Sequence, residues 1–432
     1  MLRTILLGLG VFAALFAVLV FSGKIPIGSS GSQAAGEVVL WGTIPETDMN
    51  QVIQQFNPQA RKYTVSYKEI PEAQFNKTLL EALASGTGPD LIIAPHQIIL
   101  SNASRLYPFP TASLSEKNFK DTYVDGATVF WTQGGALALP VSVDPLVLFY
   151  NRTLFSKHGL ANPPTYWDEV VSMVTPLTIP DNRGGFVESA IALGASNVPN
   201  MKDIIMATVG QLGQVPVLTS YQTDGTVYRT VTANTPIQEQ GEVYPLATTV
   251  RFFTQFADPL KSTFTWSQFG GAADDLFVAE KLAMYIGHAS ELATLRARNP
   301  KADFEMTYLP QTRGYNTFVT GGTMYGIATL RSTKNLVTAL TVESQFAGTG
   351  ISPALANFLR TVPALRSYAG LQGTPDVLAK SMLVTKPWYD SFPIESGGYV
   401  SSMLSDIING RMGPVDAAAT FVSRLQDLYT PI

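Results

Sequence analysis

The sequence predicts an α/β fold with a mainly parallel sheet and helices on both of its faces. From Glu37 onward, short apolar runs typical of buried strands alternate with stretches of helical periodicity. Such alternation is typical of parallel sheets, because each crossover between parallel strands needs a helix-length connection. The 432 residues suffice for two or three domains. We find no repeat of about 20–50 residues, which disfavours a solenoid or a propeller.

The chain begins with a segment suited to a membrane. Ile5 to Ser22 is a run of 18 residues without a charge, and it follows Arg3. As a helix it would measure roughly 27 Å, close to the ~30 Å hydrocarbon core of a bilayer. This length favours an uncleaved anchor over a signal peptide, while the small residues Ser32 and Ala34 leave cleavage after Ala34 open. In both cases Arg3 stays inside and the remainder is exported.

A linker follows this segment. We assign residues 1–22 to the signal or anchor segment and residues 23–36, in which Gly, Ser and Ala dominate, to a flexible linker. The folded body is therefore expected to begin near Glu37.

The first elements of this body are strands and helices in alternation. Asp48 caps the first helix, and Pro71 opens the second, which Gly86 and Gly88 end. The expected strands are residues 38–41, 63–67 and 90–93, and the expected helices carry residues 52–56 and 75–83.

The composition excludes several classes of protein. The net charge of -4, from 29 Lys and Arg against 33 Asp and Glu, gives no basic field for a nucleic acid. The absence of Cys excludes disulfides, thiolate metal sites and lipid attachment to an N-terminal Cys. His96, His158 and His288 have no metal-ligand spacing, and the zincin, hydrolase-elbow and phosphate-loop motifs do not occur. We therefore expect no metal, no cofactor and no enzymatic activity, although a glycosidase pair of dispersed carboxylates stays open.

Four segments of the chain carry a family resemblance. They are Phe75 to Ile92 (FNKTLLEALASGTGPDLI), Ala138 to Phe155 with Pro163 to Glu169, Phe277 to Gly287 with Leu309 to Gln311, and Thr320 to Ala328. In this order and spacing they resemble family 1 extracellular solute-binding proteins, the maltose-binding-protein-like receptors of ABC importers. The resemblance covers the chain from about residue 37 to 432.

The resemblance implies a two-lobed periplasmic-binding-protein fold of type II. In such a fold, discontinuous α/β lobes are joined by hinge strands, and here an N-terminal transmembrane helix would precede them. We expect the chain to cross between lobes near Pro140 to Asp144, Val319 to Gly322 and Val362 to Ser367. The N-terminal lobe is then 37–141 plus 320–362, and the C-terminal lobe is 142–319 plus 363–432.

Polar candidates for ligand binding come first. His96 and Gln97 follow a buried strand, at the end where open α/β sheets bind ligands. The resemblance pairs this His with an Asp, which Gln97 replaces, and a His satisfied by backbone is the alternative. Asp144 stands where the sugar receptors have an acidic residue, and a carboxylate suits vicinal hydroxyls; a capping Asp before Pro145 is the alternative. Glu46 matches another polar ligand position or simply begins a helix.

Aromatic candidates complete the expected site. Trp388 corresponds to the stacking aromatic of the family, whereas Trp41 and Trp266 suit the cleft and the core equally well. The family often has a Trp shortly after Gly287, where this chain has His288 and Glu291. This departure favours a different sugar or a ligand that is not a sugar.

One further segment supplies candidates of a different kind. Tyr325 is an alternative aromatic, and Gly321 and Gly322 allow a close backbone approach.

The resemblance also implies a function. We expect an exported receptor that closes by a hinge motion on a small molecule, a sugar or an oligosaccharide, and delivers it to ABC permease subunits served by a separate ATPase. It should be a monomer that contacts the membrane through residues 5–22 and binds no nucleic acid. The alternatives are a sensor or surface-binding protein of the same fold without a transporter, and a ligand that is not a sugar.

Overall fold

The structure is a computed structural model, and it describes residues 34–57, 62–222, 226–239, 241–370 and 375–430. The chain folds into two compact units. Of the described residues, unit 1 holds those up to Val143 and from Thr323 to 370, and unit 2 holds those from Asp144 to Gly322 and from 375 onward. The chain passes between the units inside strand β7 (Leu139–Asn151) and at the start of β16 (Gly322–Leu330).

The unit boundaries lie two, three and ten residues later than the lobe boundaries expected from the sequence. The largest difference has a physical cause, since residues after Val362 stay attached to unit 1. Strand β17 (Val362–Pro363) pairs with Val143 and Ser142 of β7. The Arg366 guanidinium forms an ion pair with Asp125, which also belongs to unit 1.

The predicted membrane segment, Ile5 to Ser22, lies outside the described residues. Within the described ranges, no helix combines the length and the hydropathy needed to span a membrane.

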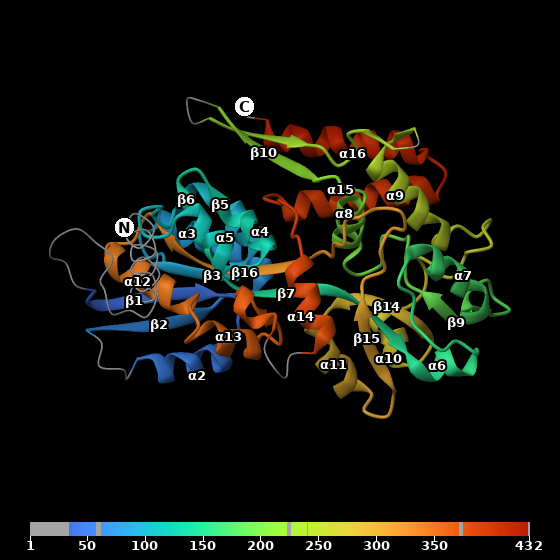
Figure 1. The fold of residues 1–432 in the computed structure, drawn as a ribbon, viewed down its shortest axis with the longest axis horizontal. Coiled ribbons are helices and arrows are strands. Elements are labelled where there is room, and N and C mark those ends of the chain that lie inside the picture. The colour runs from blue at the N-terminus through green and yellow to red at the C-terminus, as the bar shows by residue number, and fades with distance from the viewer. Residues whose placement is uncertain (1–33, 58–61, 223–225, 240, 371–374, 431–432) are drawn as a thin grey trace, which may run out of the picture. The chain divides into compact units, whose positions relative to one another are not determined.

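Unit 1 is a sheet with helices on both faces. Its strand order is β2, β1, β3, β16. In Figure 1, α2 and α13 lie along one face of this sheet and α3, α4 and α5 along the other. The strands are β1 (Gly36–Gly42), β2 (Tyr63–Glu69), β3 (Leu91–Pro95), β4 (Leu106–Tyr107), β5 (Trp131–Thr132), β6 (Gly135–Ala136), β16 and β17. The helices are α2 (Glu46–Phe56), α3 (Phe75–Ala84), α4 (His96–Ser101), α5 (Glu116–Thr122), α12 (Leu336–Phe346) and α13 (Ser352–Phe358).

The three strands expected from the sequence are confirmed as β1, β2 and β3, and β1 pairs in parallel with both others. The expectation of a mainly parallel sheet is wrong beyond them, because β16 runs antiparallel to β3. Strand direction depends on how far the chain travels between strands, and an apolar run alone does not encode it.

Unit 2 is built on a mixed sheet in the order β7, β14, β9, β8, with β15 also paired to β7. Strand β7 is antiparallel to β14 and β15, whereas β14 and β9 are parallel. Its other strands are β8 (Ile179–Pro180), β9 (Phe186–Ile191), β10 (Val217–Tyr221), β11 (Val227–Val231), β12 (Ile237–Gln238), β13 (Glu242–Val243), β14 (Leu282–His288) and β15 (Phe304–Tyr308).

Nine helices of unit 2 can be described, and they supply much of its core. They are α6 (Arg152–Lys157), α7 (Trp167–Leu177), α8 (Met201–Gln211), α9 (Pro245–Thr254), α10 (Ala273–Val278), α11 (Glu291–Arg298), α14 (Asp376–Val384), α15 (Pro393–Ile408) and α16 (Pro414–Tyr429).

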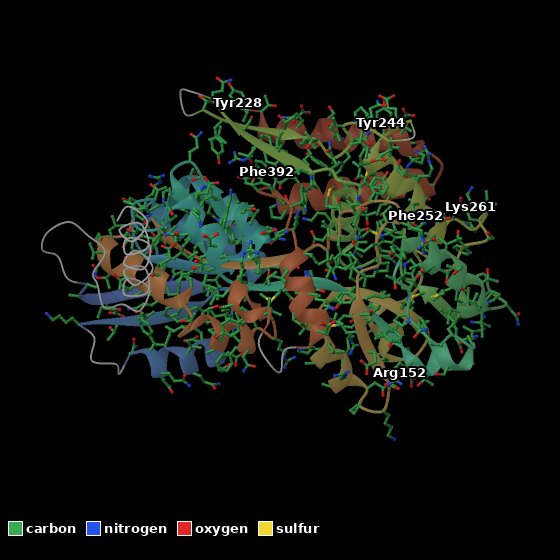
Figure 2. The ribbon with its side chains drawn as sticks, viewed as in Figure 1. Arg152, Tyr228, Tyr244, Phe252, Lys261 and Phe392 are labelled. Atoms are coloured by element: carbon green, nitrogen blue, oxygen red, sulfur yellow. The ribbon has the colours of Figure 1, made fainter. Side chains whose placement is uncertain are left out.

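The core of unit 2 is rich in aromatic rings. The ring of Trp167 meets that of Phe253 edge-on at 5.1 Å, and Phe277 stacks on Phe304 at 4.5 Å. Not every aromatic is internal, since Tyr228 on β11 and Tyr244 before α9 are exposed (Figure 2). Offset and edge-on ring pairs add about 0.5–1.5 kcal/mol to the burial of apolar area, so this core gives unit 2 a rigid frame for its polar residues.

Candidate functional site

Unit 2 brings several candidate residues together where β7, β14 and α8 meet. Asp144 lies on β7 and is only 4% exposed. Its Oδ1 accepts a hydrogen bond of 3.1 Å from the backbone N–H of Ser290, just after β14. Burial raises the pKa of the Asp144 carboxyl, and the nearby His288 works in the opposite direction. The carboxylate is thus held in a poorly solvated place by the segment that follows β14.

Glu291, the first residue of α11, is tied to that same segment. Its carboxylate accepts hydrogen bonds from the Tyr285 hydroxyl at 2.7 Å and from the backbone N–H of His288 at 2.7 Å. The side-chain amide of Asn200 donates a third bond at 3.4 Å. A Cβ at Gly287 would lie 2.7 Å from the Tyr285 ring and 2.9 Å from both carboxylate oxygens, so a larger residue would displace these side chains. Glu291 therefore fixes the end of β14 against the start of α8.

Trp388 lies in the loop between α14 and α15, is 6% exposed and packs in the hydrophobic core of unit 2. Its indole N–H donates to Oδ1 of Asp203, in the first turn of α8, at 3.2 Å. Burial raises the pKa of the Asp203 carboxyl, while Lys202 and then His288 act to lower it. Because His288 influences both Asp144 and Asp203, the imidazole lies within electrostatic reach of both carboxyls. We call Asp144, Asp203, His288, Glu291 and Trp388 the unit-2 cluster.

The two glycines expected to allow close approach do so toward the protein's own backbone. Gly322 has φ +152°, and a Cβ there would lie 2.4 Å from the carbonyl oxygen of Asp144. A Cβ at Gly321 would lie 3.1 Å from the carbonyl oxygen of Asp203. The backbone N–H of Leu146 also donates to the Gly321 carbonyl at 2.9 Å. Gly321 and Gly322 therefore let the chain at the start of β16 pass closely beside β7 and α8.

Trp266 lies apart from the unit-2 cluster. It is 1% exposed, and its indole N–H donates to the side-chain oxygen of Asn197 at 2.9 Å. It belongs to the hydrophobic core of unit 2, the alternative that its sequence context left open.

Unit 1 holds a second group of candidates. His96 and Gln97 begin α4, and His96 is 1% exposed. The backbone N–H of Met324 donates to Nδ1 of His96 at 3.3 Å. Tyr325, on β16, pairs with Pro95 at the end of β3, so it reaches the same end of the sheet.

Trp41 lies near the end of β1, and Glu46 is the first residue of α2, which follows β1 in the chain. Trp41 is 6% exposed, and the ammonium of Lys68 lies 4.7 Å from its ring centroid. Glu46 is exposed at the first position of α2, and its backbone N–H donates to Glu69 at 2.9 Å.

Asp203 was missed by the sequence reasoning. The only local signal is a polar start to α8, in which Asn200 precedes Met201 and Asp203 falls in the first turn. This pattern is typical of helix starts generally and does not by itself distinguish a ligand site. Its partner, Trp388, is 185 residues away in the chain.

The chemistry available in the unit-2 cluster is polar recognition. Carboxylates accept hydrogen bonds from hydroxyl groups, and an indole ring offers an apolar face. Among the described residues, no group of three or more His, Asp or Glu side chains is arranged to hold a metal ion.

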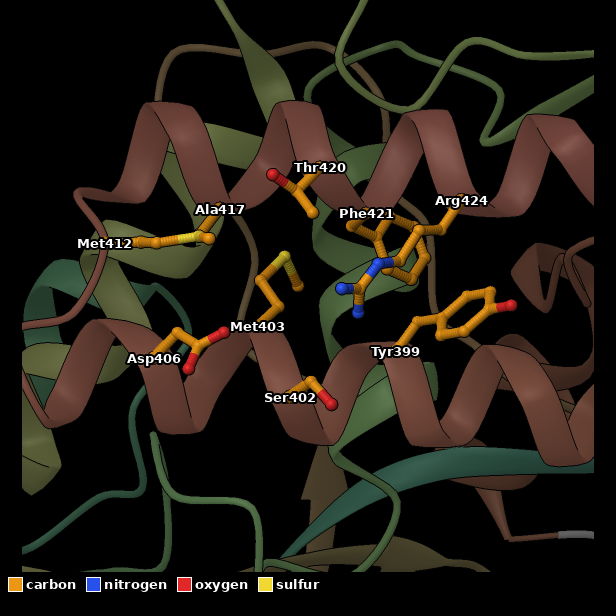
Figure 3. A pocket seen from close by; sticks show the side chains of 9 residues that line it. All are labelled: Tyr399, Ser402, Met403, Asp406, Met412, Ala417, Thr420, Phe421 and Arg424. Atoms are coloured by element: carbon orange, nitrogen blue, oxygen red, sulfur yellow. The ribbon is translucent and has the colours of Figure 1, made fainter.

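A small pocket lies elsewhere in unit 2, between α15 and α16 (Figure 3). Met403 lies between the two helices, and Phe421, Arg424 and Tyr399 stand at one end. Its volume of about 10 Å³ is enough for about one water molecule. It contains none of the candidate residues and is too small for a sugar.

Comparisons with known proteins come to the same family as the sequence motifs. The family model described as "Bacterial extracellular solute-binding protein" matches residues 42–341. A protein of Brucella abortus named as a binding protein is 23% identical over 121 residues, which are 28% of this chain and 29% of that protein. The chain thus matches less than a third of the length of this curated relative.

Solved structures resemble the chain over almost its whole length. The cyclic alpha-maltosyl-1,6-maltose binding protein from Arthrobacter globiformis has a TM-score of 0.71 at 17% identity and covers 91% of this chain and 98% of its own. An ABC substrate-binding protein from Listeria monocytogenes, in complex with cycloalternan, has a TM-score of 0.68 at 15% identity, with coverages of 91% and 99%. At these identities the likeness concerns the fold, and it confirms the two-lobed α/β expectation.

Proposed function

Because this chain belongs to the bacterial extracellular solute-binding proteins, whose family model matches residues 42–341, we propose that it is the substrate-binding protein of an ABC importer and that its ligand is a carbohydrate. The family resemblance inferred from the sequence is confirmed by that match. The observation that carries the choice of ligand is the likeness, over nine tenths of the chain, to structures whose names specify oligosaccharides.

In this proposal the unit-2 cluster provides the polar part of recognition. The carboxyl groups of Asp144 and Asp203 offer oxygen atoms that accept hydrogen bonds from sugar hydroxyls. The indole of Trp388 contributes apolar contact with a sugar ring. His96, Gln97 and Tyr325 are the corresponding proposal for unit 1, with Trp41 and Glu46 beside them.

The two compact units serve as the two lobes in this proposal. A ligand that contacts both lobes stabilises the closed arrangement by its differential contacts, which is a population shift. The closed form would then be recognised by permease subunits that work with a separate ATPase. The binding protein itself acts as a monomer and performs no catalytic step.

The proposed location is outside the cytoplasm, with the N-terminal segment as the tether. Ile5 to Ser22 is long enough to span a bilayer, and the chain has no Cys for lipid attachment. A tether of this kind keeps the receptor close to its permease.

The proposal is tested by thermal unfolding of the full-length protein in detergent with a panel of ligands. The panel holds maltotriose, a cyclic glucan, monosaccharides, polyols and amino acids, each at several concentrations. A ligand that binds only the native state increases the free energy of unfolding by RT ln(1 + [L]/Kd). Tm therefore rises with ligand concentration. We expect a sugar or oligosaccharide to raise Tm. A panel in which only amino acids do so would contradict the carbohydrate assignment.

A further inference from the structure

Lys202 and Asp390 form a buried ion pair in unit 2. The Lys202 ammonium lies 2.7 Å from Oδ2 of Asp390, whose side chain has 0% exposure. The Lys202 side chain is 18% exposed. The pair joins the first turn of α8 to the loop before α15.

Hydrogen bonds satisfy both partners of this pair. Lys202 also donates to the carbonyl of Pro393 at 3.2 Å and to the hydroxyl of Ser396 at 3.3 Å, so its ammonium has three acceptors. Oδ2 of Asp390 accepts a second bond from Ser396 at 2.8 Å, and Oδ1 accepts from the backbone N–H of Phe392 at 3.2 Å. The loop before α15 is therefore attached to α8 through one charged centre.

Burial of an ion pair is a weak source of stability, because the loss of hydration offsets much of the Coulomb attraction. A pair whose ammonium and carboxylate both have several hydrogen-bond partners does, however, define one geometry for the segments that it joins. The ion pair therefore acts mainly by fixing the geometry of the residues beside it.

The ion pair lies beside the contact between Trp388 and Asp203, both on α8 and on the loop before α15. Asp203 directly follows Lys202 and accepts the indole N–H of Trp388, which is two residues before Asp390. The Lys202 ammonium also lies 5.7 Å from the centroid of the Trp388 ring.

The other side of the loop is fixed as well. The backbone N–H of Lys386 donates to the carbonyl of Thr320 at 2.9 Å, and the N–H of Thr320 donates to the carbonyl of Val384 at 3.2 Å. For the segment from Val384 to Ser396, Asp203 accepts the indole N–H directly, and the ion pair holds the residues that follow the indole to α8. Loss of that pair would remove the charged contact that ties the loop to α8 two residues after Trp388.

We propose that Lys202 and Asp390 are positioning residues that hold the Trp388 indole against Asp203 for ligand recognition. This inference rests on the proposed function, because it assigns the pair a role in the same site. Neither residue needs to touch the ligand. Their effect passes through the orientation of the indole and of the Asp203 carboxylate.

The test uses the full-length protein with Asp390→Asn and Lys202→Met, and with Asp303→Asn as the matched control. Asp303 also belongs to an ion pair of unit 2, with Arg152 at 3.6 Å, but both side chains are more than half exposed. Ser396→Ala is a milder variant, which removes one bond to Asp390 without changing any charge. Should Asp390→Asn fail to fold, Ser396→Ala gives the same comparison with a smaller effect of the same sign.

The first readout needs no ligand. The fluorescence of Trp388 is obtained as the difference between each variant and the same variant carrying Trp388→Phe. We expect this emission to shift to longer wavelength in Asp390→Asn and Lys202→Met, and to stay at the wild-type position in Asp303→Asn. A merely structural role would lower Tm without moving this emission, and an unchanged emission in folded Asp390→Asn would overturn the inference.

The second readout is affinity for maltotriose by calorimetry, well below Tm of every variant. We expect Asp390→Asn to weaken binding about tenfold or more and Asp303→Asn to leave it unchanged. A shifted emission with wild-type affinity would overturn the recognition part of the inference. If the wild type itself bound no member of the sugar panel, the proposed function would fail, and the emission would still decide whether the ion pair positions Trp388.

Discussion

Glu343 is a carboxylic acid buried in the core of unit 1, and its replacement by Gln should stabilise the protein at neutral pH. It lies on α12 with 0% exposure, and its Oε2 accepts a hydrogen bond of 2.6 Å from the hydroxyl of Thr329 on β16. Burial raises the pKa of Glu343 from 4.5 to about 8. The folded protein therefore holds this side chain protonated at pH 7, whereas the unfolded chain ionises it.

The magnitude follows from proton linkage. Below pH 4.5 the acid is protonated in both states and costs nothing. Between pH 4.5 and about 8 only the unfolded state loses the proton, so the free energy of unfolding falls as pH rises, and above about 8 the loss is complete. At about 1.4 kcal/mol per pH unit, the cost at pH 7 is about 3 kcal/mol.

Glu343→Gln keeps the shape and an oxygen that accepts from Thr329, and it removes the ionisation. We therefore expect the variant to be more stable than the wild type by about 1–3 kcal/mol at pH 7 and by progressively less toward pH 4.5. The assay is urea unfolding of the full-length protein at a series of pH values from 4.5 to 8.5. Glu81→Gln, on the exposed side of α3, is the control and should show no pH-dependent difference. A Glu343→Gln difference that is constant across this range would refute the reasoning.

Three further predictions concern the unit-2 cluster and the two lobes. Trp388→Ala should weaken ligand affinity about tenfold or more by calorimetry, with Trp388→Phe intermediate, and wild-type affinity in Trp388→Ala would remove this side chain from the site. Gly322→Ala should destabilise the protein by about 1–3 kcal/mol in denaturant unfolding, because the new Cβ would meet the Asp144 carbonyl at 2.4 Å. Gly350→Ala, where a Cβ meets nothing within 4 Å, is its control, and equal free energies of unfolding for the two variants would contradict the steric argument. Small-angle scattering should show a smaller radius of gyration at saturating ligand, and an unchanged radius would count against hinge closure.

Local patterns in the sequence were sufficient for much of unit 1. The strands expected at 38–41, 63–67 and 90–93 overlap β1, β2 and β3, and the helix expected at 75–83 is α3. These elements are encoded by side-chain periodicity, which is a property of neighbouring residues. The predicted cap is wrong, because α2 begins at Glu46 and Asp48 lies inside its first turn. The same information does not specify which strands pair or in which direction, so the antiparallel partners of β7 and β3 were not foreseen.

The candidate site shows the same division. Asp144 and Trp388 were found by resemblance, whereas Asp203 carries only the unspecific signal of a helix start and Asp390 was not singled out. The contact between Lys202 and Asp390 joins residues 188 positions apart, so only the folded chain reveals it. Trp266 shows the converse, since an aromatic after a loop has the same sequence context whether it faces a ligand or, as here, the core.

The central claim is that this protein binds a carbohydrate through the unit-2 cluster. Calorimetric titration of the full-length wild type and of Asp144→Asn with the sugar that raises Tm tests it most directly. The account predicts saturable one-site binding to the wild type and at least about tenfold weaker binding to Asp144→Asn, in which an amide NH2 donor replaces one acceptor oxygen of the carboxyl group. Equal affinity of the two proteins, or no heat of binding with any sugar, would contradict it.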